Sequence, residues 1–155
     1  MTIIDYFEQS QESQEHWKAE ILKGDWVAAK FLHDQLQKNE VKARYGETTR
    51  LLMLTEADEL LAFCTFAEKD EIETQLTPWI GFVYTFPKHR GNRHSEKLIK
   101  YALSLAARNG HRQVYLSSRE VGLYEKYGFK PMQKMTDVWG GETQVFVCET
   151  PTADP

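Results

Sequence analysis

The turn at residues 87–95 is the part of the chain best suited to bind an anion. It follows an apolar run at residues 79–86, and an amphipathic pattern begins near Ser95. The first backbone N–H groups of a helix have no partner inside it, and the aligned peptide dipoles make that end partly positive. A strand, a basic turn and a helix start in this order therefore predict a phosphate-binding turn. The sequence of the turn is PKHRGNRHS.

The local charge of this turn differs from that of the whole chain. The chain contains 19 Lys and Arg residues against 23 Asp and Glu residues. Residues 88–97 contain four Lys or Arg side chains and one Glu, and His89 and His94 can add charge at mildly acid pH. A short basic turn on an acidic chain favours a small polyanion over nucleic acid, because duplex binding needs a broad positive face. The alternative is a solvated basic turn with no specific role.

Three other chemistries are not expected from this sequence. His89 and His94 have no Cys or carboxylate partner at metal-ligand spacing, so no metal site is predicted. The pair Ser117-Ser118 lacks the flanking glycines of a serine nucleophile elbow. Gly91 is the only glycine of the turn, which excludes the phosphate-binding loop of a nucleoside triphosphatase.

Length and composition predict a soluble globular protein. The chain has 155 residues, of which 41% are apolar and 27% charged, and we expect one domain over residues 1–150 and a frayed polar tail at 151–155. No apolar run is long enough to span a bilayer and the first residues lack a signal region, so a cytoplasmic protein without membrane contact is expected. Cys64 and Cys148 lie in apolar runs and are expected to be buried free thiols.

The patterning of apolar residues predicts an α/β fold with a mixed sheet, antiparallel at its start and finish. The order strand, turn, helix, strand around the basic turn predicts a βαβ crossover, which joins two parallel strands. Asp25 is expected to cap the second helix. The expected elements are two helices within 12–38 separated by Gly24-Asp25, a hairpin of strands at 50–55 and 60–67, a polar loop at 68–77, a strand at 79–86, a helix from Ser95 to Asn109-Gly110, a strand at 113–117, a short helix at 121–127, and a hairpin at 129–135 and 143–148.

Two separated motifs resemble those of the GNAT superfamily of acyl-CoA-dependent N-acetyltransferases. The pyrophosphate turn of that family has the pattern Arg/Gln-x-x-Gly-x-Gly/Ala, and residues 90–95 here are RGNRHS. Its late motif, Tyr-Glu-Lys-x-Gly-Phe, is matched without a gap by YEKYGF at residues 124–129. The order and separation of the motifs fit, and the flanking elements extend the resemblance over about residues 50–148. The resemblance implies a mostly antiparallel mixed sheet with a central parallel strand pair joined by a βαβ crossover, helices on both faces, and acetyl-CoA as co-substrate.

The resemblance also implies the contacts with the coenzyme. The edge of the strand from Phe82 to Thr85 would pair with the amide-rich pantetheine arm as if that arm were another strand. The thioester carbonyl is expected near the backbone N–H of Phe82 or Val83. The main-chain N–H groups expected to bind the pyrophosphate are those of Arg90, Gly91, Asn92, Arg93, His94 and Ser95.

The turn departs from the family pattern at two glycine positions, which are Arg93 and Ser95 here. Glycine at the first position lets the backbone approach a phosphate without steric cost. With helical or extended dihedrals, Arg93 would be tolerated and its guanidinium could contact a phosphate, whereas a positive φ would weaken binding. Ser95 is the smaller departure, because a small hydroxyl suits a helix N-terminus.

The resemblance implies that a primary amine attacks the acetyl-CoA thioester directly, without a covalent acyl-enzyme. Tyr124 is the expected general acid, because a phenol with a pKa near ~10 is protonated at neutral pH and can protonate a leaving thiolate of pKa about 8.5. Its alternative role is packing, which we expect for Tyr127. Glu68 and Glu120 are the candidate bases, acting directly or through water, and the alternative for both is a solvated surface charge.

The acceptor is expected to be an amine of a small molecule or of a protein, and the acidic net charge favours a cationic one. The alternative function is a non-catalytic module that binds acyl-CoA, and thiol release from acetyl-CoA with a panel of amines separates the two. An exposed C-terminal hairpin could pair two copies across a twofold axis. Five aromatic residues could line an acceptor pocket, although their spacing favours core positions: Trp17, Trp26, Phe31, Tyr45 and Trp79.

Overall fold

A mixed β-sheet forms the centre of the molecule, and the computed structural model describes residues 1–152 of the chain. The strands of this part are β1 (Thr2–Asp5), β2 (Arg50–Glu56), β3 (Glu59–Ala67), β4 (Trp79–Thr85), β5 (Gln113–Ser118), β6 (Lys130–Thr136) and β7 (Glu142–Glu149). They are ordered β1-β2-β3-β4-β5-β7-β6, and every neighbouring pair is antiparallel except β4 and β5. The predicted mixed sheet with a central parallel pair is therefore confirmed.

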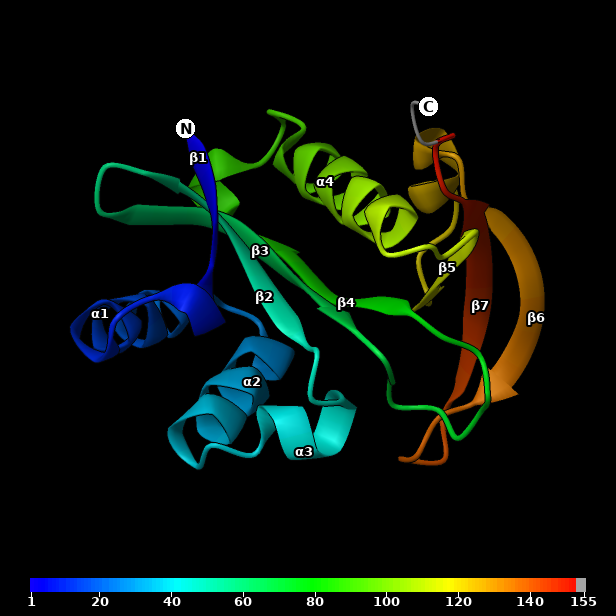
Figure 1. Cartoon of the computed structure of the whole chain (residues 1–155), viewed down its shortest axis with the longest axis horizontal. Coiled ribbons are helices and arrows are strands. Elements are labelled where there is room, and N and C mark those ends of the chain that lie inside the picture. Colours follow the sequence, from blue (N-terminus) through cyan, green and yellow to red (C-terminus); the bar gives the residue numbers. More distant parts are fainter. Residues whose placement is uncertain (153–155) are drawn as a thin grey trace.

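Helices cover both faces of this sheet, as predicted (Figure 1). On one face lie α1 (Gln11–Ile21), α2 (Val27–Gln37) and α3 (Val41–Tyr45), and on the other lies α4 (His94–Arg108), which connects β4 to β5. Three short 3₁₀ helices complete this part of the chain: η1 (Tyr6–Glu8), η2 (Pro87–His89) and η3 (Tyr124–Tyr127).

The sequence of β2 explains why helices are needed on both faces. Leu51 and Met53 pack against the α1 and α2 side, whereas Leu52 and Leu54 pack against the α4 side. Successive side chains of a strand point to opposite faces, so an unbroken apolar run must be covered twice. The two resulting apolar layers fix the position of α4, whose first turn follows directly from the basic turn.

Several details differ from the prediction. Asp25 does not cap α2, because the N-cap residue is Trp26 and the Asp25 carboxylate instead accepts a 2.6 Å hydrogen bond from the Tyr84 hydroxyl. The short helix expected at 121–127 is a 3₁₀ helix of only four residues, ended by Gly128 at φ 96°. β1 and α3 were not predicted. The tail expected at 151–155 falls for the most part, at residues 153–155, outside the described residues.

The prediction for the two cysteines is confirmed. Cys64 and Cys148 are both buried free thiols. Within residues 1–152, no helix combines the length and the apolar character that a membrane crossing requires.

Candidate functional site

A fork between β4 and β5 opens the main cleft of the described structure. The two strands are paired only at Trp79 with Tyr115 and at Ile80 with Leu116. Two residues after Ile80, Phe82 has φ 47°. The register of β4 against β3 shifts there, between Gly81 and Tyr84. Such an irregularity increases the local twist and bends the strand. A cleft of about 1090 Å³ lies beyond the fork.

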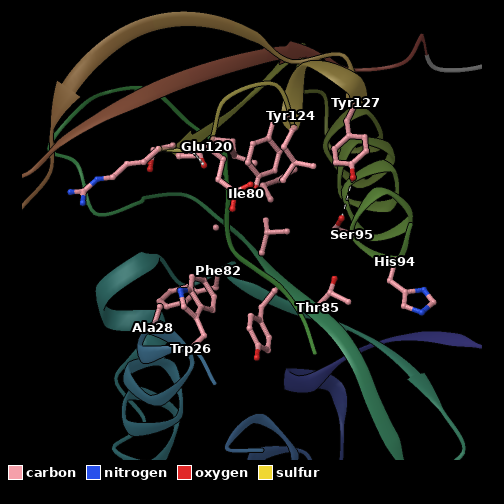
Figure 2. Close-up of a pocket in the computed structure, with 18 of the residues that line it drawn as sticks. Trp26, Ala28, Ile80, Phe82, Thr85, His94, Ser95, Glu120, Tyr124 and Tyr127 are labelled. Carbon is pink, nitrogen blue, oxygen red and sulfur yellow. Dashed lines mark hydrogen bonds between the residues drawn. The ribbon is translucent and has the colours of Figure 1, made fainter. Parts of the chain in front are cut away.

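This cleft brings together most of the residues predicted from the motifs. Figure 2 shows Tyr124 and Glu120 on the side opposite Trp26 and Phe82. Glu68 does not line the cleft; its side chain is exposed and lies against Gly46. Asn92 is also absent from the lining. The predicted residues that do line it are Phe82, Val83, Thr85, Arg90, Gly91, Arg93, His94, Ser95, Glu120 and Tyr124.

The basic turn is held by its own side chains and leaves backbone donors free. Arg90 Nε donates to the Thr85 carbonyl at 3.0 Å, and the Asn92 amide donates to the His89 carbonyl at 3.1 Å. The backbone N–H of Arg90, which was also predicted to bind the pyrophosphate, is not free, because it donates to the Pro87 carbonyl at 3.3 Å. Within the described residues, the backbone N–H groups from Gly91 to Ser95 donate to no other group of the chain. Free N–H groups at the start of a 15-residue helix fit an anion such as a diphosphate.

Arg93 adopts the left-handed conformation, with φ 58° and ψ 32°. Of the two alternatives for Arg93, the positive φ that would weaken coenzyme binding is therefore the one found. A residue with a side chain costs about 1–2 kcal/mol more than glycine in this backbone conformation. The Arg93 guanidinium is also highly exposed and lies 3.8 Å from the Glu96 carboxylate. Arg93 and Glu96 therefore form an ion pair at the surface.

The two residues that begin α4 have different surroundings. His94 is buried, and its Nδ1 atom has no hydrogen-bond partner within residues 1–152. Burial, with smaller effects of Lys97 and His89, lowers the pKa of His94, so this ring adds less positive charge to the turn than the sequence alone indicates. The Ser95 hydroxyl lies 3.3 Å from the Tyr127 hydroxyl, and Figure 2 shows this contact beside the cleft.

Tyr124 combines a buried ring with a hydroxyl that faces the cleft. Its ring packs on Phe129 and Phe146, with centroids 6.4 Å and 6.2 Å away. The hydroxyl lines the cleft and makes no hydrogen bond to any described residue. Burial, followed by the nearby Glu120 carboxylate, raises the pKa of Tyr124 well above its usual value. The phenol therefore stays protonated at neutral pH.

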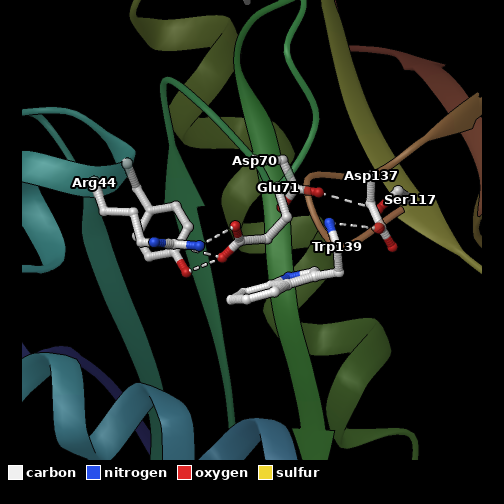
Figure 3. A network of polar contacts seen from close by, with 7 residues as sticks. Arg44, Asp70, Glu71, Ser117, Asp137 and Trp139 are labelled. Atoms are coloured by element: carbon white, nitrogen blue, oxygen red, sulfur yellow. Dashed lines mark hydrogen bonds and ion pairs between the residues drawn. The ribbon is translucent and has the colours of Figure 1, made fainter. Parts of the chain in front are cut away.

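Two acidic residues of the loop before β4 were missed by the sequence analysis (Figure 3). Glu71 receives two hydrogen bonds from the Arg44 guanidinium, at 3.0 Å and 2.6 Å, and one from the Tyr45 hydroxyl. Asp70 accepts a 3.0 Å hydrogen bond from the Ser117 hydroxyl of β5. Both line the cleft. A polar loop gives no periodic signal, so its path over the fork could not be predicted.

Asp70 has the most perturbed carboxyl group of the cleft. Burial raises its pKa to about 6, and the neighbouring carboxylates of Glu71 and Asp137 add to this effect. The Ser117 hydrogen bond acts in the opposite direction because it stabilises the ionised form.

Most of the aromatic residues considered for an acceptor pocket belong to the core. Trp17, Tyr45 and Trp79 are buried. Trp26 is the exception that lines the cleft, where it stacks on Tyr84 at 5.3 Å between ring centroids. Phe31 lies 5.9 Å from Trp139, which belongs to the turn between β6 and β7. Trp139 is 67% exposed, and it is one of three rings that contact the Arg44 guanidinium, with Phe31 and Tyr45.

Comparison with known proteins agrees with the family inferred from the two motifs. Residues 70–132 match a family model described as an acetyltransferase (GNAT) domain. No curated protein sequence matches the chain significantly.

Solved structures share the fold at low sequence identity. A protein assigned to the GNAT family of acetyltransferases from Desulfovibrio desulfuricans has a TM-score of 0.71 and 12% identity, over 97% of this chain and 99% of its own. An aminoglycoside 6'-N-acetyltransferase complexed with coenzyme A has a TM-score of 0.67 and 12% identity, over 100% of both chains. A spermidine N-acetyltransferase chimera that includes Vibrio cholerae sequence has a TM-score of 0.66 and 14% identity, over 97% of both chains.

Proposed function

Because this chain has the GNAT acetyltransferase fold and a segment that matches the family's domain model, we propose that it is an acetyl-CoA-dependent N-acetyltransferase that acts on a primary amine. One observation above all supports this proposal. The free backbone donors of the turn at residues 91–95 and the fork between β4 and β5 lie at the same cleft as the Tyr124 hydroxyl. We place this activity in a single domain over residues 1–150.

We propose that the turn and the fork hold acetyl-CoA in an extended conformation. The N–H groups of residues 91–95 bind its diphosphate, and the unpaired edge of β4 from Phe82 to Thr85 pairs with the pantetheine amides. Asn92 contributes through its backbone alone, because its side-chain amide is bonded to the His89 carbonyl. Bound acetyl-CoA supplies an activated thioester, whose carbonyl we place near the N–H of Phe82 or Val83.

The chain's own residues then control protons around direct attack by the amine. A neutral amine forms the new C–N bond at the thioester carbon, and the C–S bond breaks. Tyr124 donates its phenolic proton to the departing thiolate and regains one from the nitrogen of the new amide. Of the two bases predicted from the sequence, Glu120 lines the cleft and Glu68 does not, so the geometry favours Glu120.

The chemistry of the cleft supports a cationic acceptor. It is lined by carboxylates from several elements as well as by the basic turn, so it can hold positive and negative groups together. Solved enzymes of the same fold include ones described as acting on aminoglycosides and on spermidine, which are polyamines. The carboxylates that line the cleft are those of Asp25, Asp70, Glu71, Glu120 and Asp137.

Two measurements test the proposal. Calorimetry with coenzyme A and with acetyl-CoA should detect binding of both. Thiol release from acetyl-CoA should then depend on an added amine, with spermidine, kanamycin and a lysine-containing peptide as the first panel. Binding without thiol release for any amine would instead support the non-catalytic acyl-CoA-binding module, for which the left-handed Arg93 is the specific observation. Absence of binding would contradict both functions.

A further inference from the structure

Asp70 occupies the apex of the fork, where β4 and β5 stop pairing. The last paired positions are Ile80 and Leu116, so Gly81 and Ser117 are the first residues past the ladder. Asp70 contacts both strands there: its Oδ2 accepts the 3.0 Å bond from Ser117 Oγ, and its Oδ1 lies 3.0 Å from the place where a Cβ of residue 81 would be. A Cβ at position 81 would therefore require this carboxylate to shift by a few tenths of an ångström.

This position puts Asp70 beside the place proposed for the thioester. Gly81 directly precedes Phe82, whose N–H is one of the two candidates for contacting the thioester carbonyl. Asp70 lines the same cleft as Tyr124, whereas the carboxylate of Glu71 is taken up by Arg44 and Tyr45. Only the Ser117 hydroxyl donates a side-chain hydrogen bond to Asp70 among the described residues, which leaves accepting capacity for an incoming ammonium group.

We propose that Asp70 is the group that binds the acceptor ammonium and removes its proton before the amine attacks the thioester. This inference rests on the proposed function, and in it Asp70 replaces Glu120, the better placed of the two candidates found in the sequence, as the base. The step transfers one proton from the ammonium nitrogen to Asp70 Oδ1, which gives a neutral amine and a carboxylic acid. The acid returns the proton to solvent after the amide has formed, while the second proton of the nitrogen passes through Tyr124 to the thiol.

The surroundings of Asp70 support this role. A base should have a pKa near the working pH, and burial raises the pKa of Asp70 to about 6. The groups that face it act in both directions: the Ser117 hydroxyl of β5 and the backbone N–H of Glu71 lower its pKa, whereas the carboxylates of Glu71 and of Asp137, in the turn between β6 and β7, raise it. The nearby positive charge of the Arg119 guanidinium lies 3.7 Å from the Asp137 carboxylate and is paired with it.

The test compares Asp70→Asn with Glu73→Gln, a control in the same loop whose carboxylate is exposed and does not line the cleft. Asparagine keeps the size of Asp70 and an oxygen for Ser117 but cannot take a proton. We expect Asp70→Asn to lower kcat/KM for the best amine of the panel by about 100-fold or more, with an unchanged calorimetric Kd for coenzyme A. In the wild type and in Glu73→Gln, kcat/KM should fall below about pH 6, and this acid limb should be lost in Asp70→Asn.

A second variant separates catalysis from damage to the fold. Ser117→Ala removes the hydrogen bond that stabilises the Asp70 carboxylate, so the acid limb should move to higher pH while the coenzyme Kd stays the same. An active wild type with an Asp70→Asn variant within threefold of it would overturn the inference and leave the proposed function standing. So would an acid limb that persists in Asp70→Asn.

If no amine of the panel is acetylated, a direct titration still decides the matter. Carbon-detected NMR of protein labelled in its aspartate carboxyl groups identifies Asp70 by the resonance missing in Asp70→Asn. A midpoint near 6 that shifts when spermidine is added would support the inference. A midpoint near 4, or one that spermidine leaves unchanged, would overturn it.

Discussion

Replacement of Tyr124 by phenylalanine should separate catalysis from stability unusually well. The Tyr124 ring packs on Phe129 and Phe146, and phenylalanine keeps these contacts. The hydroxyl makes no hydrogen bond to a described residue, so its removal leaves no buried partner unsatisfied. We therefore expect the free energy of unfolding to change by less than about 0.5 kcal/mol.

The effect on turnover should be much larger. General acid catalysis contributes about 100-fold to 10,000-fold to a rate, which corresponds to about 2.7–5.4 kcal/mol of activation free energy. We expect a fall in kcat within this range for Tyr124→Phe, with an unchanged KM for acetyl-CoA. Because burial raises the pKa of Tyr124, the wild type should show no alkaline limb from this residue below about pH 10.

The assay is continuous detection of released thiol with saturating acetyl-CoA. Tyr101→Phe is the matched control, because Tyr101 is a partly exposed residue of α4 that does not line the cleft. A Tyr124→Phe variant that keeps wild-type kcat, while remaining folded and able to bind coenzyme A, would refute the assignment of Tyr124 as the acid.

Three further predictions concern stability and the acceptor. Arg93→Gly should raise the unfolding free energy by about 0.5–1 kcal/mol, because relief of the left-handed conformation exceeds the entropy gained by the unfolded chain; a loss in urea unfolding would contradict this. Because the pKa of Asp70 is raised in the folded state, ionisation of this carboxyl group destabilises the fold as pH rises from about 4 through 6. Asp70→Asn should therefore have the same unfolding free energy as wild type at pH 4 and a higher one at pH 8, by up to about 3 kcal/mol. Urea unfolding at both pH values checks this, and an equal difference at the two would argue against it. Trp139→Ala removes an aromatic contact of Arg44 and should raise the KM for the amine but not the KM for acetyl-CoA. Initial rates with each substrate varied in turn measure both constants, and a raised KM for acetyl-CoA would contradict this prediction.

The parts of the fold that were predicted correctly are those with a strong apolar period. The nearly continuous apolar run of β4 and the helical spacing of Leu98, Ile99 and Ala102 predicted the crossover, and the parallel pair followed from it. β1 was missed because four residues give too short a pattern, and it forms through pairing with β2 rather than through its own propensity.

The site was predictable where it depends on local chain geometry. The turn at residues 90–95 and Tyr124 lie within continuous motifs, so their place in the cleft could be expected. Asp70 reaches the cleft because the polar loop between β3 and β4 places it beside Gly81 and Ser117. Such a position depends on contacts between segments distant in sequence, here Asp70 with Ser117, and no local pattern contains that information.

The short ladder between β4 and β5 has a mechanical consequence. Two paired positions are all that join the strands β1–β4 to the strands β5, β7 and β6 within the sheet, and α4 bridges the two halves from one side. This line is a seam between the two halves of the sheet, and an extended ligand bound along it would link them. Amide hydrogen exchange should therefore slow on both sides of the seam when coenzyme A is added, in β5 and β7 as well as in β4.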